Sequence, residues 1–102
     1  MNTENAEAFR EQIRKELEEN RKAFEGLYKE ELEGLLGLSR EELDKIIPGR
    51  TDVETYDKLI TVVKKASAAN ISQAVLKDRI VELGGIAVSI AKRVAKLADI
   101  FI

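Results

Sequence analysis

The side chains that could carry out chemistry in this chain are carboxylates, lysines and hydroxyls, because the sequence contains neither histidine nor cysteine. Histidine is the most frequent general base and the commonest metal ligand. Cysteine is needed for disulfides, thiolate metal sites and thiol nucleophiles. We therefore expect no catalytic residue, no metal site, no cofactor and no small-molecule substrate, and we predict that the chain is not an enzyme.

Acidic clusters and glycines are the remaining candidates for ligand chemistry. The two clusters consist of Glu30, Glu31 and Glu33, and of Glu41, Glu42 and Asp44. Neither cluster alternates oxygen ligands around a glycine turn, as a calcium loop does. Gly34, Gly37 and the pair Gly84–Gly85 are too sparse for a phosphate-binding loop. We interpret the acids as solvated helix faces and the glycines as helix ends.

One stretch has the spacing of a known nucleic-acid motif. Hydrophobic, glycine and small residues occur at Leu83, Gly85, Ile86, Ala91 and Val94. With these residues, segment 80–96 resembles the helix-hairpin-helix family, with Gly84 in place of the family's proline and Ala87 in place of its second glycine. The resemblance implies sequence-independent DNA binding, in which amides at a helix N-terminus hold a phosphate and basic side chains add contacts. The implied contact residues are Gly84, Gly85, Lys92, Arg93 and Lys96.

Apolar spacings of three and four residues and strong capping signals predict an all-α protein with about five helices and no strand. The expected helices cover approximately residues 3–33, 39–47, 51–70, 72–83 and 86–102. Capping boxes at Ser39–Glu42 and Thr51–Glu54, and a cap at Ser72, mark three of the starts. We expect one domain over residues 1–102, with a long charged N-terminal helix in 1–34 and a compact helical core in 38–102.

The final predicted helix, Ile86 to Ile102, is apolar around most of its circumference, so it should be buried at the centre of the bundle. Lys92, Arg93 and Lys96 make it too charged to span a membrane, and we predict a cytoplasmic protein. Tyr28 and Tyr56 lie on apolar stripes, which favours core positions with the hydroxyl at the rim. The predicted core consists of Leu43, Ile46, Ile47, Tyr56, Ile60, Val63, Leu76, Ile80, Leu83, Ile86, Ile90, Val94, Leu97 and Phe101.

The N-terminal helix carries the leading functional hypothesis. An unbroken helix would be about 45 Å long, so it must project, bend near Gly26, or pack against a second copy. Residues at spacings of three and four form a possible seam with a polar residue inside it, which can set register in a coiled coil. The seam consists of Ile13, Leu17, Asn20, Phe24 and Leu27. We predict a protein-interaction or self-association module, with a homodimer as the leading partner state, although packing within the chain would use the same residues.

Overall fold

The structure, a computed structural model, describes residues 3–46 and 53–102, with side chains from Ala6 onward. The described residues form seven α-helices and a short 3-10 helix, and no strand occurs within these two ranges. The helices are α1 (Thr3–Glu25), α2 (Lys29–Leu36), α3 (Arg40–Ile46), α4 (Val53–Ala68), α5 (Gln73–Glu82), α6 (Gly85–Ala91), α7 (Ala95–Ala98) and the 3-10 helix η1 (Asp99–Phe101). The all-α prediction is confirmed, but the first and last predicted helices each divide.

The first predicted helix breaks at Gly26, where α1 ends and the chain turns into α2. A Cβ at Gly26 would overlap the backbone carbonyl of Ser67 in α4, so only glycine allows this close approach. The Leu27 amide donates to Oδ1 of Asn70 at 3.2 Å, which replaces a hydrogen bond that a continuous helix would make. The continuous helix over residues 3–33 is therefore wrong, and a bend near Gly26 is what occurs.

The last predicted helix breaks between α6 and α7. Arg93 and Val94 donate to carbonyls three residues earlier, at 3.1 Å each, which tightens the turn after Ala91. Val94 is then extended (φ −94°, ψ 114°), and its Cγ1 lies 2.5 Å from where a Cβ on Gly34 would stand. Gly34 therefore lies inside α2 as a packing position, and does not end a helix as predicted. The break lets Val94 bury against α2, and a continuous helix over residues 86–102 is wrong.

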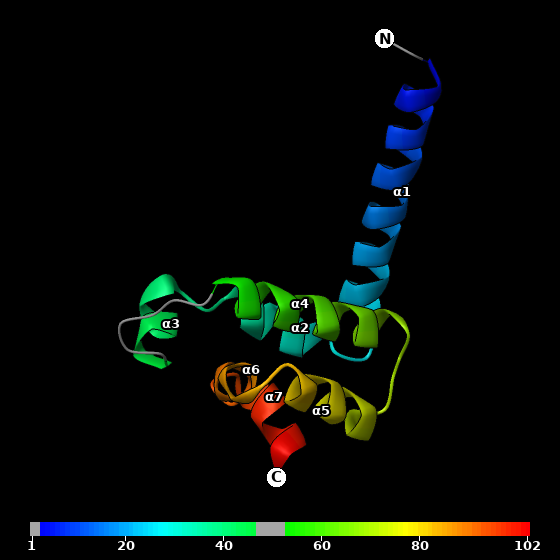
Figure 1. The fold of residues 1–102 in the computed structure, drawn as a ribbon. Coiled ribbons are helices and arrows are strands. Elements are labelled where there is room, and N and C mark those ends of the chain that lie inside the picture. Colours follow the sequence, from blue (N-terminus) through cyan, green and yellow to red (C-terminus); the bar gives the residue numbers. More distant parts are fainter. Residues whose placement is uncertain (1–2, 47–52) are drawn as a thin grey trace.

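The body of the protein has two layers of helices (Figure 1). One layer holds α2 and α4, and the other holds α5, α6 and α7, while α3 lies at the far end from α1. α4 contacts α1, α2, α5 and α6, so α4 occupies the centre in place of the predicted C-terminal helix. The C-terminal segment is nevertheless enclosed, since Ile90 and Leu97 are buried and Phe101 packs half-buried against the core.

Most of the predicted core is buried or half-buried. Ile86 is the exception, with 37% of its surface exposed. α6 turns its small side chains, Ala87 and Ala91, towards the core. This orientation leaves Ile86 at the surface. Ile47 lies outside the described residues. α2 contributes the buried residues Leu32, which the sequence placed in the charged N-terminal helix, and Leu35, which lay between the predicted helices.

Local capping predictions are confirmed where the structure describes them. The Glu42 amide donates to Ser39 Oγ at 3.1 Å, and the Val75 amide donates to Ser72 Oγ at 3.4 Å. The box that starts at Thr51 lies outside the described residues. Gly84 has φ +109°, a conformation that strongly favours glycine, and it lies between α5 and α6, so the prediction of a helix end at this glycine is confirmed.

α1 projects from this body as an arm (Figure 1). Every side chain from Glu7 to Glu19 is exposed. The radius of gyration is 15.5 Å, compared with about 13 Å for a compact domain of this size. Among the residues that the structure describes, no helix has both the length and the apolar character needed to cross a membrane.

Candidate functional site

The predicted seam on the N-terminal helix is divided between two environments. Ile13 and Leu17 lie on the projecting part of α1, with 39% and 64% of their surfaces exposed. Phe24 is half-buried against the core at the base of α1. Asn20 is half-buried beside α4, and Leu27 is exposed in the turn after α1. Of the seam residues that lie within α1, only Ile13 and Leu17 are therefore exposed, and they form the outer part of the seam.

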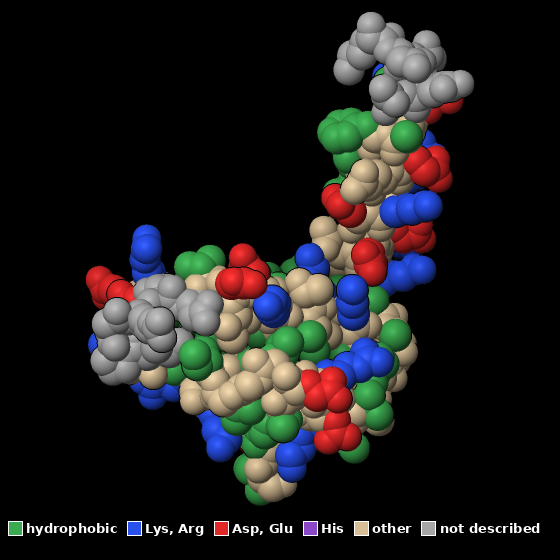
Figure 2. Space-filling view, in the orientation of Figure 1, with side chains coloured by type: hydrophobic (Ala, Val, Ile, Leu, Met, Phe, Trp, Pro, Cys, Tyr) green, Lys and Arg blue, Asp and Glu red, His purple; other side chains and the backbone are tan. Residues whose placement is uncertain are grey.

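Phe9 extends this outer part towards the tip of the arm, with 65% of its surface exposed. Phe9, Ile13 and Leu17 are four residues apart, so they project from one face of the helix. We call these three residues the outer stripe. Figure 2 shows hydrophobic side chains gathered on one side near the tip of the arm and charged side chains along the opposite side. The outer stripe is an exposed apolar surface and is therefore a candidate interaction site.

Charged residues of opposite sign lie on the two flanks of the outer stripe. At about 100° per residue, Arg10, Arg14 and Arg21 fall on one flank. Glu16 and Glu19 fall on the other flank. Arg21 is paired with Glu18 at 3.6 Å, and both side chains are more than half exposed, so this ion pair contributes little to stability. The charged side chains of both flanks are exposed to solvent.

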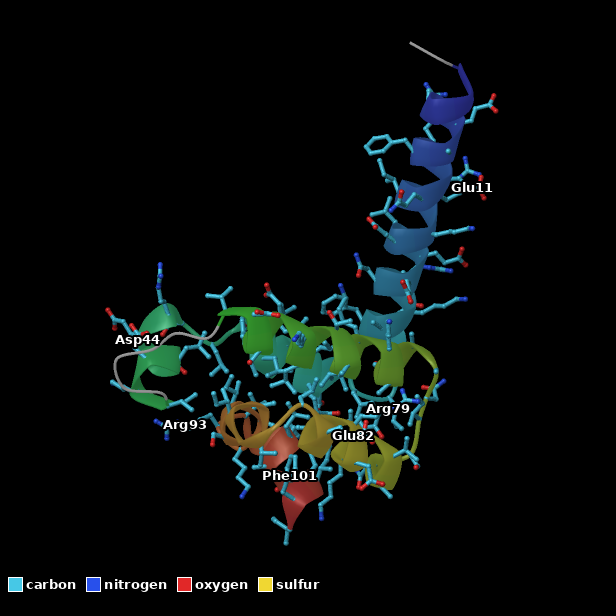
Figure 3. The ribbon with its side chains drawn as sticks, in the orientation of Figure 1. Glu11, Asp44, Arg79, Glu82, Arg93 and Phe101 are labelled. Carbon is cyan, nitrogen blue, oxygen red and sulfur yellow. The ribbon has the colours of Figure 1, made fainter. Side chains whose placement is uncertain are left out.

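The base of the arm and α4 form an elbow. A small open pocket of about 90 Å³ lies at this elbow, lined by Glu19 and Asn20 from α1 and by Thr61, Lys64 and Lys65 from α4. Figure 3 shows Glu11 on the side of α1 turned away from the elbow. All five lining residues have polar or charged side chains. The elbow marks where the free part of α1 ends.

The residues implied in DNA binding are placed at different points. Gly85 is exposed at the start of α6, with no atom near its missing side chain. Lys92 and Arg93 are exposed at the other end of α6, about 10 Å away along the helix axis. Lys96 pairs with Glu30 of α2 at 3.0 Å. The methyl group of Ala87 is buried in the core. The structure thus does not gather Gly84, Gly85 and the three basic residues around one phosphate position.

No observation in the structure favours DNA binding over the other hypothesis, and it stays a prediction. A fluorescence titration against duplex DNA at several salt concentrations tests it, because phosphate contacts release counterions and weaken with salt. Lys92→Glu combined with Arg93→Glu would abolish such binding.

The titratable groups with shifted pKa values have structural partners. The hydroxyl of Tyr28 donates to the Ile71 carbonyl, and that of Tyr56 donates to the Leu35 carbonyl. Burial raises the pKa of both tyrosines. The prediction that both are core residues with the hydroxyl at the rim agrees with Tyr28 buried and Tyr56 half-buried. Each hydroxyl therefore donates to a backbone carbonyl in another segment of the chain.

The acidic residues do not form a metal site among the described residues. Glu30 and Glu33 are exposed on α2, and Glu31 is half-exposed. Burial raises the pKa of Glu31, partly opposed by a backbone hydrogen bond. The acids of α3, Glu41, Glu42 and Asp44, are exposed. The clusters are arranged as the solvated helix faces that the sequence suggested.

A scan against protein-family models, a search of curated proteins and a search of solved structures each found no match for this chain.

Proposed function

We propose that this protein is a non-catalytic interaction module whose projecting helix binds a helix of another protein chain. The observation that carries the proposal is the exposure of the outer stripe, Phe9, Ile13 and Leu17, on an arm that the body leaves free. Residues four apart on one helix face are the usual anchors when a helix packs against a helix or into a groove. Burying them against a partner would remove apolar surface from water, which is the main favourable term in association.

The sequence of the arm supports binding by a preformed helix. The side chains on the outer part of α1 are exposed, so the helix there depends on interactions between its own residues. Glu11 precedes Lys15 by four residues, and Glu18 precedes Lys22 by four, the order in which opposite charges stabilise a helix. A helix that is formed before binding loses less conformational freedom on association.

The side-chain inventory supports a role without catalysis. The chain has no histidine and no cysteine, and the hydroxyls of Tyr28 and Tyr56 are engaged with backbone carbonyls. Carboxylates and lysines are mostly exposed on helix faces. An absence of cysteine suits a reducing compartment, so a cytoplasmic location is part of the proposal.

Site-specific photo-crosslinking in the cells that make the protein tests the proposal. A photoreactive phenylalanine analogue replaces Phe9 on the outer stripe, and the matched control carries it at Glu11, which faces the other way (Figure 3). We expect a discrete crosslinked product with Phe9 replaced and none with Glu11 replaced. Equal products at both positions, or none at Phe9, would show that the outer stripe is not a binding surface.

A further inference from the structure

We infer that the outer stripe binds a second copy of this chain, with the two α1 helices antiparallel and residue 11 of each level with the two-fold axis. This inference rests on the proposed function and names the partner for the same surface. Three observations carry it: the position of α4, the free length of the arm, and the distribution of charge on one flank.

The position of α4 rules out parallel pairing along the predicted seam. At the base of α1, Ala23 is fully buried, and Asn20 and Phe24 are half-buried, with α4 as the main helix in contact with α1. In a parallel pair related by a two-fold axis, equal residue numbers face each other at every level. The base of the partner helix would then need the space that α4 already fills, since packed helices lie about 8–10 Å apart.

Antiparallel pairing avoids this conflict, because the base of each arm lies beyond the tip of the other. The free part of α1, residues 3–19, is about 25 Å long. Full overlap of two such segments places residue 3 of one chain level with residue 19 of the other, at the elbow. For any two residues that face each other across the pair, the two residue numbers then add up to approximately 22. The elbow therefore sets the limit of the overlap and, with it, the register.

In this register the outer stripes of the two chains meet. Phe9 of each copy lies level with Ile13 of the other, so this contact occurs twice around the axis. Leu17 of each copy lies near Ala6 of the other, and Ala6 is a small residue on the same face of α1. A large residue opposite a small one lets the helix ends approach closely.

The charge pattern on the basic flank fits the antiparallel arrangement. Glu7 lies on the same flank as Arg10 and Arg14, at the end nearest the tip. In an antiparallel pair, the basic flank of one α1 helix lies beside the basic flank of the other. Glu7 of each chain then faces Arg14 of the other, and two ion pairs form. Parallel helices would bring Glu16 towards Arg21, at the level where α4 lies. The two Arg10 side chains approach each other beside the axis, which limits the affinity.

The contact area is small, since each chain offers three large apolar side chains. Stable complexes bury about 800 Å² on each partner, and less is available here. We therefore expect a weak dimer.

Analytical ultracentrifugation over a range of concentrations tests whether the outer stripe holds the dimer. Ile13→Gln is expected to raise the dissociation constant at least tenfold, because it places a polar amide at the centre of the contact. Glu11→Gln, on the opposite face, is the matched control and leaves the constant unchanged. Thermal unfolding of Ile13→Gln checks that the body still folds, as the exposure of Ile13 leads us to expect.

Spin labels test the orientation, and the absence of native cysteine allows single labelling sites. Ala8→Cys and Lys22→Cys both lie on the face of α1 away from the outer stripe. In the antiparallel dimer the two labels at position 8 are offset along the axis by about 9 Å and those at position 22 by about 33 Å. Pulsed electron paramagnetic resonance should therefore give a clearly longer distance for position 22.

The outcomes separate this inference from the proposed function. Equal distances at positions 8 and 22 would mean parallel helices, and a dimer unaffected by Ile13→Gln would mean a different interface. Either result overturns the inference. A strictly monomeric protein at hundreds of micromolar also overturns it. If the crosslinked product at Phe9 then contains a different protein, the proposed function stands with another partner; if no product forms, both fail.

Discussion

The hydroxyl of Ser67, near the end of α4, donates a 2.5 Å hydrogen bond to the backbone carbonyl of Ala23, in the last turn of α1. The same oxygen accepts a 3.1 Å hydrogen bond from the amide of Tyr28, just before α2. One buried side chain thus satisfies backbone groups on both sides of the break at Gly26. This contact fixes the direction in which the arm leaves the body.

Replacing Ser67 with alanine should destabilise the protein by about 1–3 kcal/mol, because it leaves the buried Tyr28 amide without its acceptor and removes one of the two hydrogen bonds to the Ala23 carbonyl, which keeps the one from the Gly26 amide. The free energy of unfolding in urea measures this loss. Ser89→Ala is the control, since Ser89 is exposed and its hydroxyl bonds within its own helix, to Gly85. A Ser67 variant as stable as the Ser89 variant would show that the hydroxyl does not hold the break together.

Gly26→Ala should lower stability more than an ordinary glycine substitution, because the new Cβ would overlap the carbonyl of Ser67 and force the two helices apart. We expect a fall in melting temperature of several degrees or more. Gly85→Ala is the matched control, as nothing lies within 4 Å of a Cβ there. We expect Gly85→Ala to be neutral or stabilising, since alanine favours helix. Equal melting temperatures for the two variants would contradict the close approach.

Ile90→Ala and Leu97→Ala should each cost about 2–5 kcal/mol, as buried large-to-small substitutions do. Both side chains are at most 1% exposed. Ile86→Ala, in the same helix as Ile90, should cost clearly less, because Ile86 is 37% exposed. Chemical denaturation of the three variants checks this order. A loss at Ile86 as large as at Ile90 would favour the continuous buried helix that the sequence suggested.

The contribution of Tyr28 to stability should depend on pH in the alkaline range. Burial, aided by Glu31, raises the pKa of its hydroxyl in the folded protein above the ordinary value of 10.0. The unfolded chain then loses the tyrosine proton first, so stability is retained below about pH 10 and falls as the pH rises further. Tyr28→Phe should cost about 1–2 kcal/mol at pH 8, and this difference should shrink above about pH 10. Urea unfolding of both proteins at several pH values measures it; a constant difference up to pH 11 would contradict the burial of this hydroxyl.

Features that depend on neighbours in the sequence could be predicted without the structure. The caps at Ser39 and Ser72 connect groups three residues apart, and the apolar spacing of α4 and α5 follows one turn of helix. The positive φ at Gly84 needs only a glycine after a helix. Ile13 and Leu17 were part of the predicted seam, whereas Phe9 was not included in it, although its spacing of four residues places it on the same face of the helix.

The break in the last helix could not be predicted, and the sequence offered a bend near Gly26 only as one of three possibilities, because each break depends on residues far away in the chain. Gly26 meets Ser67, and Val94 meets Gly34. The apolar period is continuous across both positions, and a single glycine such as Gly26 can be tolerated within a helix. A continuous helix gives up its regular hydrogen bonds there because packing against another helix replaces them with other hydrogen bonds and buried contacts.

The sequence by itself determined that this chain is all helical, where several helices begin, and which face of the N-terminal helix is apolar, since each of these depends on spacings within one or two turns. Only the tertiary structure decided which part of that face is free. α4 covers the end of α1 at Ala23 and Phe24 and leaves the outer stripe exposed. This division could not be read from periodicity, because it is set by the path of the chain after Gly26 and by the contact that Ser67 makes across it.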